Sequence, residues 1–438
     1  RLGTLLYFNF LRGKVIFMSI LTTLYIGIDV SKRSNTICAI DFEQKVYCKF
    51  TELNNEVGAT AIKNRITPIL INNKFTNVQF IIESTGVYSY HIATFLSSND
   101  ELMKFNSTVY CVNPKAARNY KSSYVDSDKT DPADAFMLAD FGRVGRTKNI
   151  TPWRGPQLLA LQRLTRYRIH LTEQITREKN YVLNNIFLKF SEMSVLENKE
   201  FPFSNKFGAT SKAVLTDFIS SEEIVDTSIE DLTKFICTKG KGRFSKPEEV
   251  AILLQKAARD SYRLDKVAYD PINIAIASSL NCIKTFENEI KLVTPAIESN
   301  IKGINPQGYE ILKSIPGIGP VFASGILSEI GSIEQFEDEE GLAKYAGITW
   351  RKKQSGKFEA EETQMTKTGN AYLRYYIAEA TASVVRYLPE YNEYFNKKYN
   401  EVTTHQYKRA LALTSRKLIR LIYGLLRKNQ LYKTQVNK

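Results

Sequence analysis

Short runs of apolar residues, separated by polar breaks, fill the first third of the chain. Three runs come close together, a spacing typical of a three-stranded meander, and later runs alternate with stretches of helical periodicity. The predicted strands are 24–30, 35–41, 45–51, 77–82 and 108–112, and the predicted helices between them are 56–71 and 88–96. This order predicts a mixed sheet with helices packed against it.

The same order, with a further helix after the fifth strand, matches the α/β ribonuclease H-like (RuvC-like) fold. We therefore expect such a domain over residues 24–150. Residues 1–23 begin without methionine and are expected to be a non-native or disordered extension. A signal peptide is the alternative, but no small-residue cleavage site separates this segment from the first strand.

The middle of the chain, residues 151–305, has helical patterning. Apolar residues recur at spacings of three, four and seven over 157–190, and helical patterning resumes over 250–258 and 272–293. Residues 191–250 are polar and broken by proline and glycine, so we expect an insertion of weaker structure there. An antiparallel helical pair, a dimerising coiled coil and a simple helical spacer all fit this region.

The last third, residues 306–438, is predicted to be a separate, mostly helical domain. Residues 311–323 predict a helix, a tight turn at Pro316-Gly-Ile-Gly319 and a second helix, which together form a helix-hairpin-helix. Further helices are predicted over 373–387 and 407–426. The last of these carries Lys408, Arg409, Arg416, Lys417, Arg420 and Arg427.

Charge narrows the choice of partner. The 438 residues contain 60 Lys and Arg against 46 Asp and Glu, a formal net charge of +14, which favours an anionic partner. No apolar run after position 30 approaches the roughly 18 residues of a membrane span, so we expect DNA and no membrane. Five scattered cysteines without a C-x-x-C pair predict a reducing, cytoplasmic location, and we expect the protein to be associated with the nucleoid.

Two acids stand where predicted strands end. Asp29 lies in the first apolar run, and Glu83 follows the run 77–82. Each has a simple interpretation as a solvated strand-end carboxylate. An acid beside a buried strand is nevertheless costly unless a cation neutralises it.

Two further acids open the next predicted helix, which runs to Gly142. Asp131 before Pro132 makes a good N-cap, and Asp134 complements the helix dipole, so both have a structural explanation. The same i, i+3 spacing also puts both carboxylates on one face of the first turn. Asp126 and Asp128 compete for this role, and they rank lower because they precede the proline.

Four carboxylates converging from separate segments would repel one another unless divalent ions lay between them. Oxygen ligands without a nearby His or Cys favour Mg²⁺ or Mn²⁺ over zinc. Such a cluster is the usual apparatus of two-metal phosphodiester chemistry. The sequence therefore predicts that Asp29, Glu83, Asp131 and Asp134 are catalytic metal ligands.

These segments resemble a known family. The segments of this chain that carry the resemblance are Tyr25-Ile-Gly-Ile-Asp-Val-Ser-Lys32, Glu83-Ser-Thr-Gly-Val-Tyr88, Lys129-Thr-Asp-Pro-Ala-Asp-Ala135 and Ile315-Pro-Gly-Ile-Gly-Pro320. They resemble, in order, the motifs of the insertion sequence 110 family of DEDD transposases, which is related to the pilin-gene invertases. The resemblance covers about 24–146 and 308–388, and it implies that the four acids form the metal-binding tetrad of a Holliday-junction-resolvase-like domain.

The resemblance also implies a serine that attacks DNA to give a covalent phosphoserine, with donor and target sites chosen by a guide RNA that the element encodes. Ser355 matches that serine, in the basic loop Arg351-Lys-Lys-Gln-Ser-Gly-Lys357. A hydroxyl is a poor nucleophile without a base or metal, and no histidine is near in sequence. We therefore expect a composite site within a homo-oligomer (dimer or tetramer), in which the tetrad supplies the metal.

Several further residues are expected to bind nucleic acid. The turn amides of the helix-hairpin-helix would face a phosphate, which gives affinity without sequence reading, although a purely structural turn fits as well. The expected contacts are Gly317, Gly319, Arg351, Lys352, Lys353, Lys357, Lys367 and Arg374.

The chain departs from the family pattern in three places. Thr366 stands where a serine is often expected before Lys367, Trp350 replaces a commoner proline, and residues 191–250 are long for the linker. Two alternatives to a recombinase stay open. One is a structure-specific nuclease that cuts with metal-activated water and never rejoins strands, and the other is a non-catalytic nucleic-acid-binding protein.

Overall fold

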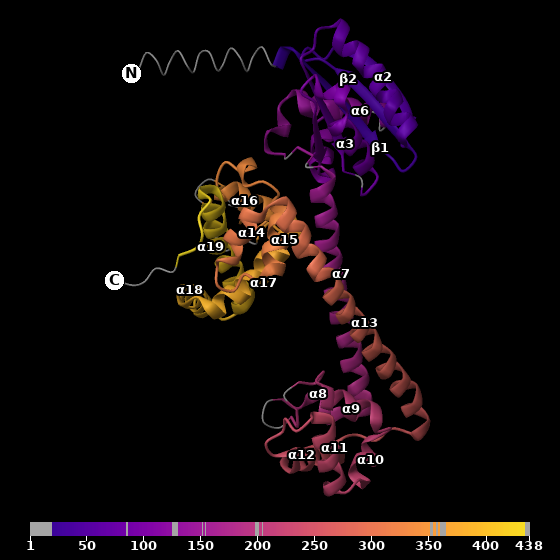
Figure 1. The fold of residues 1–438 in the computed structure, drawn as a ribbon, viewed down its shortest axis with the longest axis vertical. Helices are drawn as coiled ribbons and strands as arrows, with labels where there is room; N and C mark the ends of the chain where they lie inside the picture. Colours follow the sequence, from indigo (N-terminus) through magenta and orange to yellow (C-terminus); the bar gives the residue numbers. More distant parts are fainter. Residues whose placement is uncertain are drawn as a thin grey trace, which may run out of the picture. The chain divides into compact units, whose positions relative to one another are not determined.

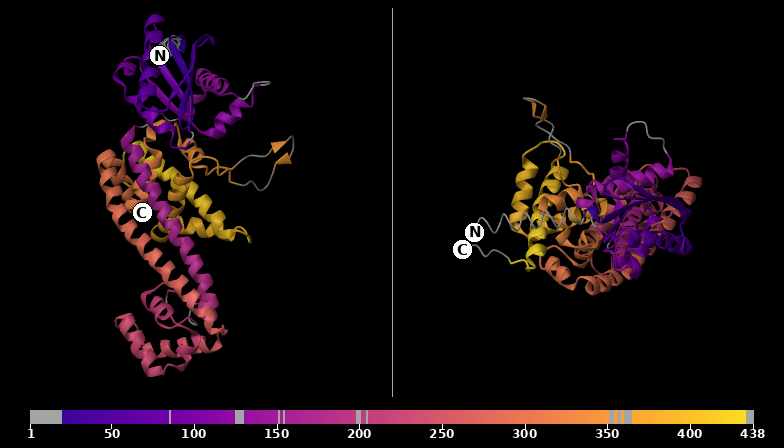
Figure 2. Two further views of the ribbon diagram at one scale, coloured as in Figure 1. Left: turned by 90° about the vertical axis from the view of Figure 1, so that its right-hand side faces the viewer. Right: turned by 90° about the horizontal axis from the view of Figure 1, so that it is seen from above.

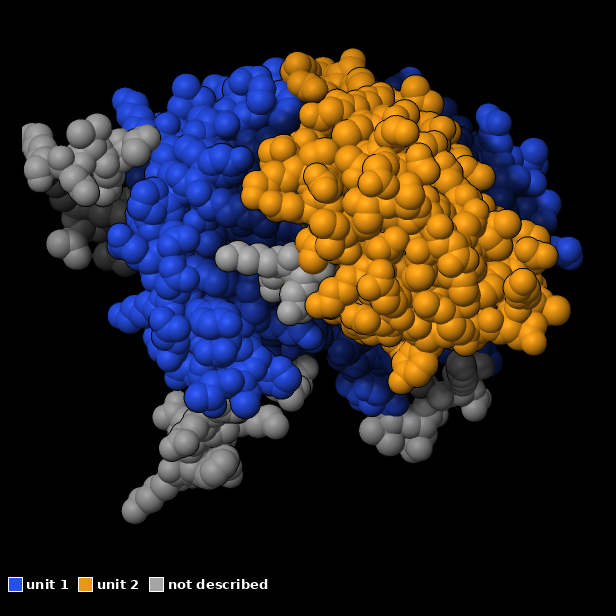
Figure 3. All heavy atoms as spheres, turned by 90° about the horizontal axis from the view of Figure 1, so that it is seen from below, with its two compact units in different colours: residues 1–162, 304–438 blue, residues 163–303 orange. Residues whose placement is uncertain are grey.

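A computed structural model describes residues 20–84, 86–124, 130–150, 152–153, 155–197, 201–203, 205–350, 354–355, 358–359 and 365–433. The chain divides into two compact units, residues 1–162 with 304–438 and residues 163–303 (Figure 3). In the described part of the chain, no helix is long and apolar enough to cross a membrane.

Five strands form one sheet in the order β3-β2-β1-β4-β5. They are β1 (Thr23–Val30), β2 (Ser34–Ile40), β3 (Val46–Leu53), β4 (Asn77–Glu83) and β5 (Thr108–Val112). The first three pair antiparallel as a meander, whereas β4 pairs parallel with β1 and β5 pairs parallel with β4. The prediction of a mixed sheet from these five segments is therefore confirmed.

Helices cover both faces of this sheet (Figure 1). They are α2 (Glu56–Asn72), α3 (Ser89–Ser98), α5 (Pro114–Lys121) and α6 (Asp131–Arg143). Ile26 belongs to the core under α2 and α3, whereas Tyr25 packs with α6, and Ile81 with α5 and α6. Side chains alternate between the two faces along a strand, so Asp29 shares the α6 face with Tyr25.

Gly27 allows α6 to lie directly on β1. A β-carbon at Gly27 would come within 1.9 Å of the Ala135 carbonyl oxygen and 2.4 Å of the Ala139 nitrogen. Further along α6, a β-carbon at Gly142 would contact Tyr25. The helix therefore runs antiparallel to β1, and its first turn lies beside the carboxyl end of that strand.

Residues 163–303 contain most of two long helices, α7 (Pro156–Lys189) and α13 (Lys266–Ile304), which lie side by side (Figures 1 and 2). Arg168 Nε donates to Thr294 Oγ1 at 3.3 Å near one end of the pair. Near the other end, Val182 and Ile283 belong to one core. The helices are thus antiparallel within one chain, which is one of the three interpretations left open by the sequence.

The prediction of weak structure over 191–250 is wrong. The chain there forms α8 (Ser191–Val195), α9 (Ala209–Asp217), α10 (Ser221–Asp226), α11 (Ile229–Gly240) and the start of α12 (Pro247–Asp260). Leu215, Leu232 and Ile236 are buried in a core shared with α7 and α13. Short helices escape a search for long periodic patterns, because α8, α9, α10 and α11 each contribute only one or two buried apolar residues to the core.

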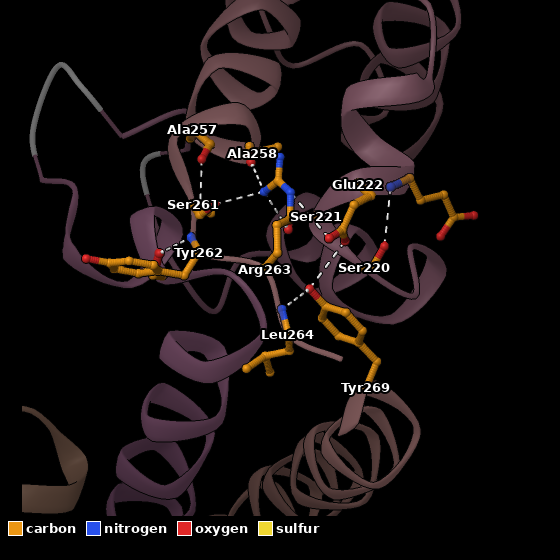
Figure 4. A network of polar contacts seen from close by, with 12 residues as sticks. Ser220, Ser221, Glu222, Ala257, Ala258, Ser261, Tyr262, Arg263, Leu264 and Tyr269 are labelled. Atoms are coloured by element: carbon orange, nitrogen blue, oxygen red, sulfur yellow. Dashed lines mark hydrogen bonds and ion pairs between the residues drawn. The ribbon is translucent and has the colours of Figure 1, made fainter. Parts of the chain in front are cut away.

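A polar network fixes the turn between α12 and α13 (Figure 4). Arg263 Nη1 donates to the carbonyl oxygens of Ala258 and Ser261 at 2.7 and 2.9 Å. Arg263 Nε lies 3.3 Å from Glu222 Oε1, and the Tyr269 hydroxyl donates to Glu222 Oε2 at 3.3 Å. One basic and one acidic side chain balance each other here, and their other contacts are neutral.

The C-terminal elements are α14 (Pro306–Lys313), α15 (Pro320–Ile330), α16 (Glu339–Ala346), β6 (Gln354–Ser355), β7 (Phe358–Glu359), α17 (Ala371–Tyr387), α18 (Pro389–Asn400) and α19 (Gln406–Lys428). The predicted pair of helices around the glycine turn is confirmed by α14 and α15, and the later predictions by α17 and α19. The remainder of the chain beyond the sheet is mostly helical, as expected. The short hairpin β6–β7 was not predicted.

Candidate active site

Asp29 and Glu83 lie side by side at the carboxyl ends of neighbouring strands. In the parallel register of β1 and β4, Ile28 is opposite Ile82, so the next residue on each strand is one of the two acids. Adjacent strands lie about 4.8 Å apart. Because Ile81 packs in the core on the α6 face, strand alternation puts Glu83 on that face together with Asp29.

The first turn of α6 brings Asp131 and Asp134 to the same edge of the sheet. The N-cap residue is Thr130, in an extended conformation, and Asp131 is the first helical residue. The prediction that Asp131 is the N-cap is therefore wrong by one position. Asp134 is half-buried and Asp131 is exposed. One structural explanation for Asp131 is thereby removed.

The charges of the other three acids act on Asp29. Burial raises the pKa of Asp29, and the nearby charge of Lys121 offsets part of that rise. The carboxylates of Asp134, Asp131 and Glu83 raise the pKa of Asp29 again. The structure therefore brings Glu83, Asp131 and Asp134 within range of the charge of Asp29, so the four acids converge as the sequence predicted.

A lysine that the sequence analysis missed lies between two of these acids. Lys121 Nζ, from the last residue of α5, donates to Glu83 Oε2 at 2.9 Å and lies 3.0 Å from Asp134 Oδ2. Burial alone would lower the pKa of Lys121, but the two carboxylates outweigh it and raise that pKa, so the side chain is charged. A lysine at the end of a helix is ordinary in sequence, so no sequence pattern pointed to Lys121.

Asp140, on the buried face of α6, anchors the neighbouring helix. Its carboxylate accepts hydrogen bonds from Tyr120 at 2.5 Å, from Arg143 Nε at 2.6 Å and from Tyr124. Burial alone would raise its pKa, but these hydrogen bonds hold the pKa of Asp140 below its ordinary value. Since Tyr120 immediately precedes Lys121, this network fixes the last turn of α5.

The side chains at this site offer the type of ligand atom that binds a divalent cation. All four acids offer carboxylate oxygens, the ligands that Mg²⁺ and Mn²⁺ prefer, and an ammonium already lies between Glu83 and Asp134 as a stand-in cation. Within the described ranges, however, no three His, Cys, Asp or Glu side chains lie in a ready-made metal-binding arrangement. Binding of a metal would therefore require side chains at this edge to move.

Ser355 lies in the short hairpin that follows α16. Strand β6 pairs antiparallel with β7, with Ser355 opposite Phe358, and Trp350 forms a bridge with Met365. The predicted basic neighbours Arg351, Lys352, Lys353 and Lys357 lie outside the described residues, as do Asp126 and Asp128. The role of Ser355 as a nucleophile stays a prediction.

The other residues predicted to contact nucleic acid lie at separate places in the C-terminal elements. Gly317 has a φ of +99°, and a β-carbon there would lie 2.7 Å from the backbone of α17, so packing alone requires a glycine. Arg374 Nη1 donates to the Ala346 carbonyl oxygen at 3.0 Å. Gly319 is the N-cap of α15, and Lys367 is exposed. Contact of these residues with nucleic acid stays a prediction.

Two family models match the chain. Residues 26–189 match the DEDD transposase model of IS110, which is described as a transposase. Residues 309–396 match a model described as the transposase IS116/IS110/IS902 family. The first range includes all four acids, and the second includes Ser355.

Named proteins are similar to the chain over most of its length. An uncharacterized 44.8 kDa protein of insertion element IS116 from Streptomyces clavuligerus is 22% identical over 93% of this chain and 96% of its own length. The pilin gene-inverting protein of Moraxella lacunata is 22% identical over 94% of this chain and 99% of its own length. The transposase for insertion sequence element IS1111A from Coxiella burnetii is 24% identical over 39% of this chain and 50% of its own length.

Proposed function

The chain belongs to the IS116/IS110/IS902 family of transposases, and we propose that it moves its own DNA element by metal-dependent strand cleavage and rejoining. It is a DNA recombinase, and the family match favours an enzyme over the non-catalytic binding protein. The observation that supports the metal-dependent part is that Glu83, Asp131 and Asp134 lie near Asp29, with Lys121 bridging Glu83 and Asp134. Such an excess of negative charge calls for further cations.

In this proposal, the four acids of a ribonuclease H-like domain hold Mg²⁺ or Mn²⁺. When bound, the ions would stabilise charge on the attacking and leaving oxygens of the scissile phosphate. Asp29 and Glu83 are held by the rigid sheet, whereas Asp131 and Asp134 project from the first turn of α6. The positive end of that helix dipole favours anionic groups at this edge.

Ser355 is the proposed nucleophile. Its Oγ–phosphorus bond forms as the bond from phosphorus to one DNA oxygen breaks, and the serine proton ends on that departing oxygen as a hydroxyl. Attack by a strand-end hydroxyl on the phosphoserine then rejoins DNA and restores the serine. The support is the family match over 309–396 and the basic residues beside Ser355 in the sequence, which would hold the phosphate.

We also propose a guide RNA and a dimer or tetramer, and family membership is the support for both.

The distribution of charge indicates which part of the chain meets nucleic acid. Residues 163–303 contain 21 Lys and Arg against 19 Asp and Glu, a net charge of only +2 out of +14. The other unit, which contains the acids and the serine hairpin, carries the rest of the positive charge.

Trapping of a covalent adduct tests this function. The substrate is a plasmid carrying the DNA that flanks the gene, transcribed in the same reaction so that RNA from this DNA is present. We expect wild-type protein with Mg²⁺ to give a protein–DNA adduct that survives denaturation. Ser355→Ala should give none, and the exposed Ser332→Ala is the matched control that keeps it.

The nuclease alternative predicts a different result from the same assay. If Ser355→Ala cuts at the wild-type rate and no adduct forms with any variant, the serine mechanism is wrong. If Asp29→Asn cuts and rejoins as wild type does, the metal-binding role of the acids is wrong.

A further inference from the structure

We propose that Lys121 is the counter-ion of the metal-free site and that a divalent ion must displace its ammonium from between Glu83 and Asp134 to bind. The inference rests on the proposed role of the four acids as metal ligands. It adds a residue outside that tetrad, which sets how tightly and when the site takes up metal.

The contacts of Lys121 are unlike those of an ordinary surface lysine. Its ammonium joins a strand acid to a helix acid, at 2.9 Å from Glu83 Oε2 and 3.0 Å from Asp134 Oδ2. The lysine side chain is 20% exposed, and the two acids are 19% and 22% exposed. Exposed ion pairs contribute little because water screens them, whereas this pair of contacts is largely shielded from water.

Charge explains why the ammonium lies there. Four carboxylates meet at this edge, and like charges so close together repel one another. The ammonium neutralises one of these charges and links β4 to the first turn of α6. Without a cation in this position, nothing would hold Glu83 and Asp134 together.

The position of the ammonium is also the position that a metal needs. One oxygen of Glu83 and one of Asp134 lie within 3.0 Å of the same nitrogen atom, and a divalent ion bound by both would occupy that space. An ammonium and a metal ion cannot share it. Binding of one therefore competes with binding of the other.

The chain allows Lys121 to leave without a rearrangement of the fold. Tyr120 anchors the last turn of α5 by donating to the buried Asp140. The four-carbon stem of a lysine is flexible, so its ammonium can swing out while the backbone stays in place. Metal uptake then needs a change of side-chain rotamers and no movement of α5.

Titration of the full-length protein with Mn²⁺ alone, without DNA, tests the inference. Free Mn²⁺ is counted by electron paramagnetic resonance for the wild type, Lys121→Met and Lys115→Met. Lys115 is exposed on the same helix and is the matched control for loss of one positive charge. We expect Lys121→Met to bind Mn²⁺ about 10-fold more tightly than the wild type, and Lys115→Met to bind as the wild type does.

Thermal melting of the same proteins gives a second readout. Without metal, Lys121→Met should have the lowest Tm, because its acids are unneutralised, and Mn²⁺ should raise its Tm more than that of the wild type. Equal or weaker Mn²⁺ affinity in Lys121→Met overturns the inference while leaving the metal site intact. Equal tightening in Lys115→Met also overturns it, and no binding by any variant overturns the metal site itself.

Discussion

Two polar clusters in this chain differ in the balance between acidic and basic side chains. In the middle unit, which is residues 163–303, Arg263 lies against Glu222. The other contacts of Arg263 are to neutral oxygens. At the edge of the sheet, the described side chains are four acids and one lysine, Lys121, whose ammonium joins Glu83 to Asp134. A balanced cluster stabilises the turn that it joins. An unbalanced one is a poor way to stabilise a fold, and this is one reason why we propose it as a site for a cation supplied from outside.

The pKa values of Glu222 and Asp29 also differ between the two clusters, because one is lowered and the other is raised. Burial would raise the pKa of Glu222, but its hydrogen bonds and the charge of Arg263 lower it, so the fold favours the ionised form. The pKa of Asp29 is raised, so the metal-free fold disfavours its ionised form. The proposed metal-binding role of Asp29 therefore requires an ionised form that the metal-free fold disfavours, whereas at Glu222 the fold favours the ionised form.

The largest expected effect is that of Asp29→Asn on DNA cleavage. Loss of a metal-binding carboxylate should lower the cleavage rate about 10³-fold, because the bound ions contribute several kcal/mol of transition-state stabilisation. In the metal-free protein, the same change should raise Tm, since it removes one of four repelling charges. Asp100→Asn, at an exposed acid, is the control for both measurements. A variant with both lower Tm and full activity would contradict the account.

Gly27→Ala should have the next largest effect, this time on folding. The new β-carbon would overlap the backbone of α6 at Ala135 and push the helix off β1, at about 3 kcal/mol of unfolding free energy. Gly424→Ala is the control, because nothing lies within 4 Å of a β-carbon there. Urea unfolding measures both. An unchanged midpoint for Gly27→Ala would show that α6 does not lie directly on the strand.

Arg263→Ala tests the balanced cluster and should have a moderate effect. Loss of its hydrogen bonds to the Ala258 and Ser261 carbonyl oxygens should lower the free energy of unfolding by about 1–2 kcal/mol. Mn²⁺ affinity should stay at the wild-type value, because the network belongs to the middle unit. A large loss of Mn²⁺ binding would mean that the two clusters are not independent.

The smallest expected effect is a difference in pH dependence. The raised pKa of Asp29 means that its destabilising charge is absent below its ordinary pKa of 3.8 and develops as pH rises through the raised value. The stabilisation from Glu222 is present above its ordinary pKa of 4.5 and is lost as pH falls through the lowered value. Melting curves of metal-free Asp29→Asn and Glu222→Gln against pH should therefore show Tm differences of opposite sign, both shrinking in acid. If the two substitutions change Tm in the same direction across this pH range, the proposed difference between the two clusters is wrong.

Much of the architecture followed from periodicity. The strands were predicted because their apolar runs are short and bounded by polar breaks, and long helices such as α7 were predicted because their spacing persists over many turns. The convergence of the four acids was predictable as well. Strand ends and helix starts meet at one edge in a sheet of this order, so acids at those positions become neighbours.

Features that depend on contacts between distant segments could not be predicted. The helices within 191–250 share one core, but each is too short to show a period by itself. Lys121 and Asp140 gave no signal, because a lysine at the end of a helix and an acid in a helix are ordinary in sequence. Their importance comes from the acids and tyrosines that the fold brings to them.

Anomalous diffraction from crystals of the full chain soaked in Mn²⁺ tests the central claim most directly. We expect a manganese peak about 2–2.5 Å from carboxylate oxygens of Asp29 and at least one other acid of the four, with the Lys121 ammonium moved out of contact with Glu83. A map without a peak at this edge of the sheet, and with Lys121 still joining Glu83 to Asp134, would contradict it.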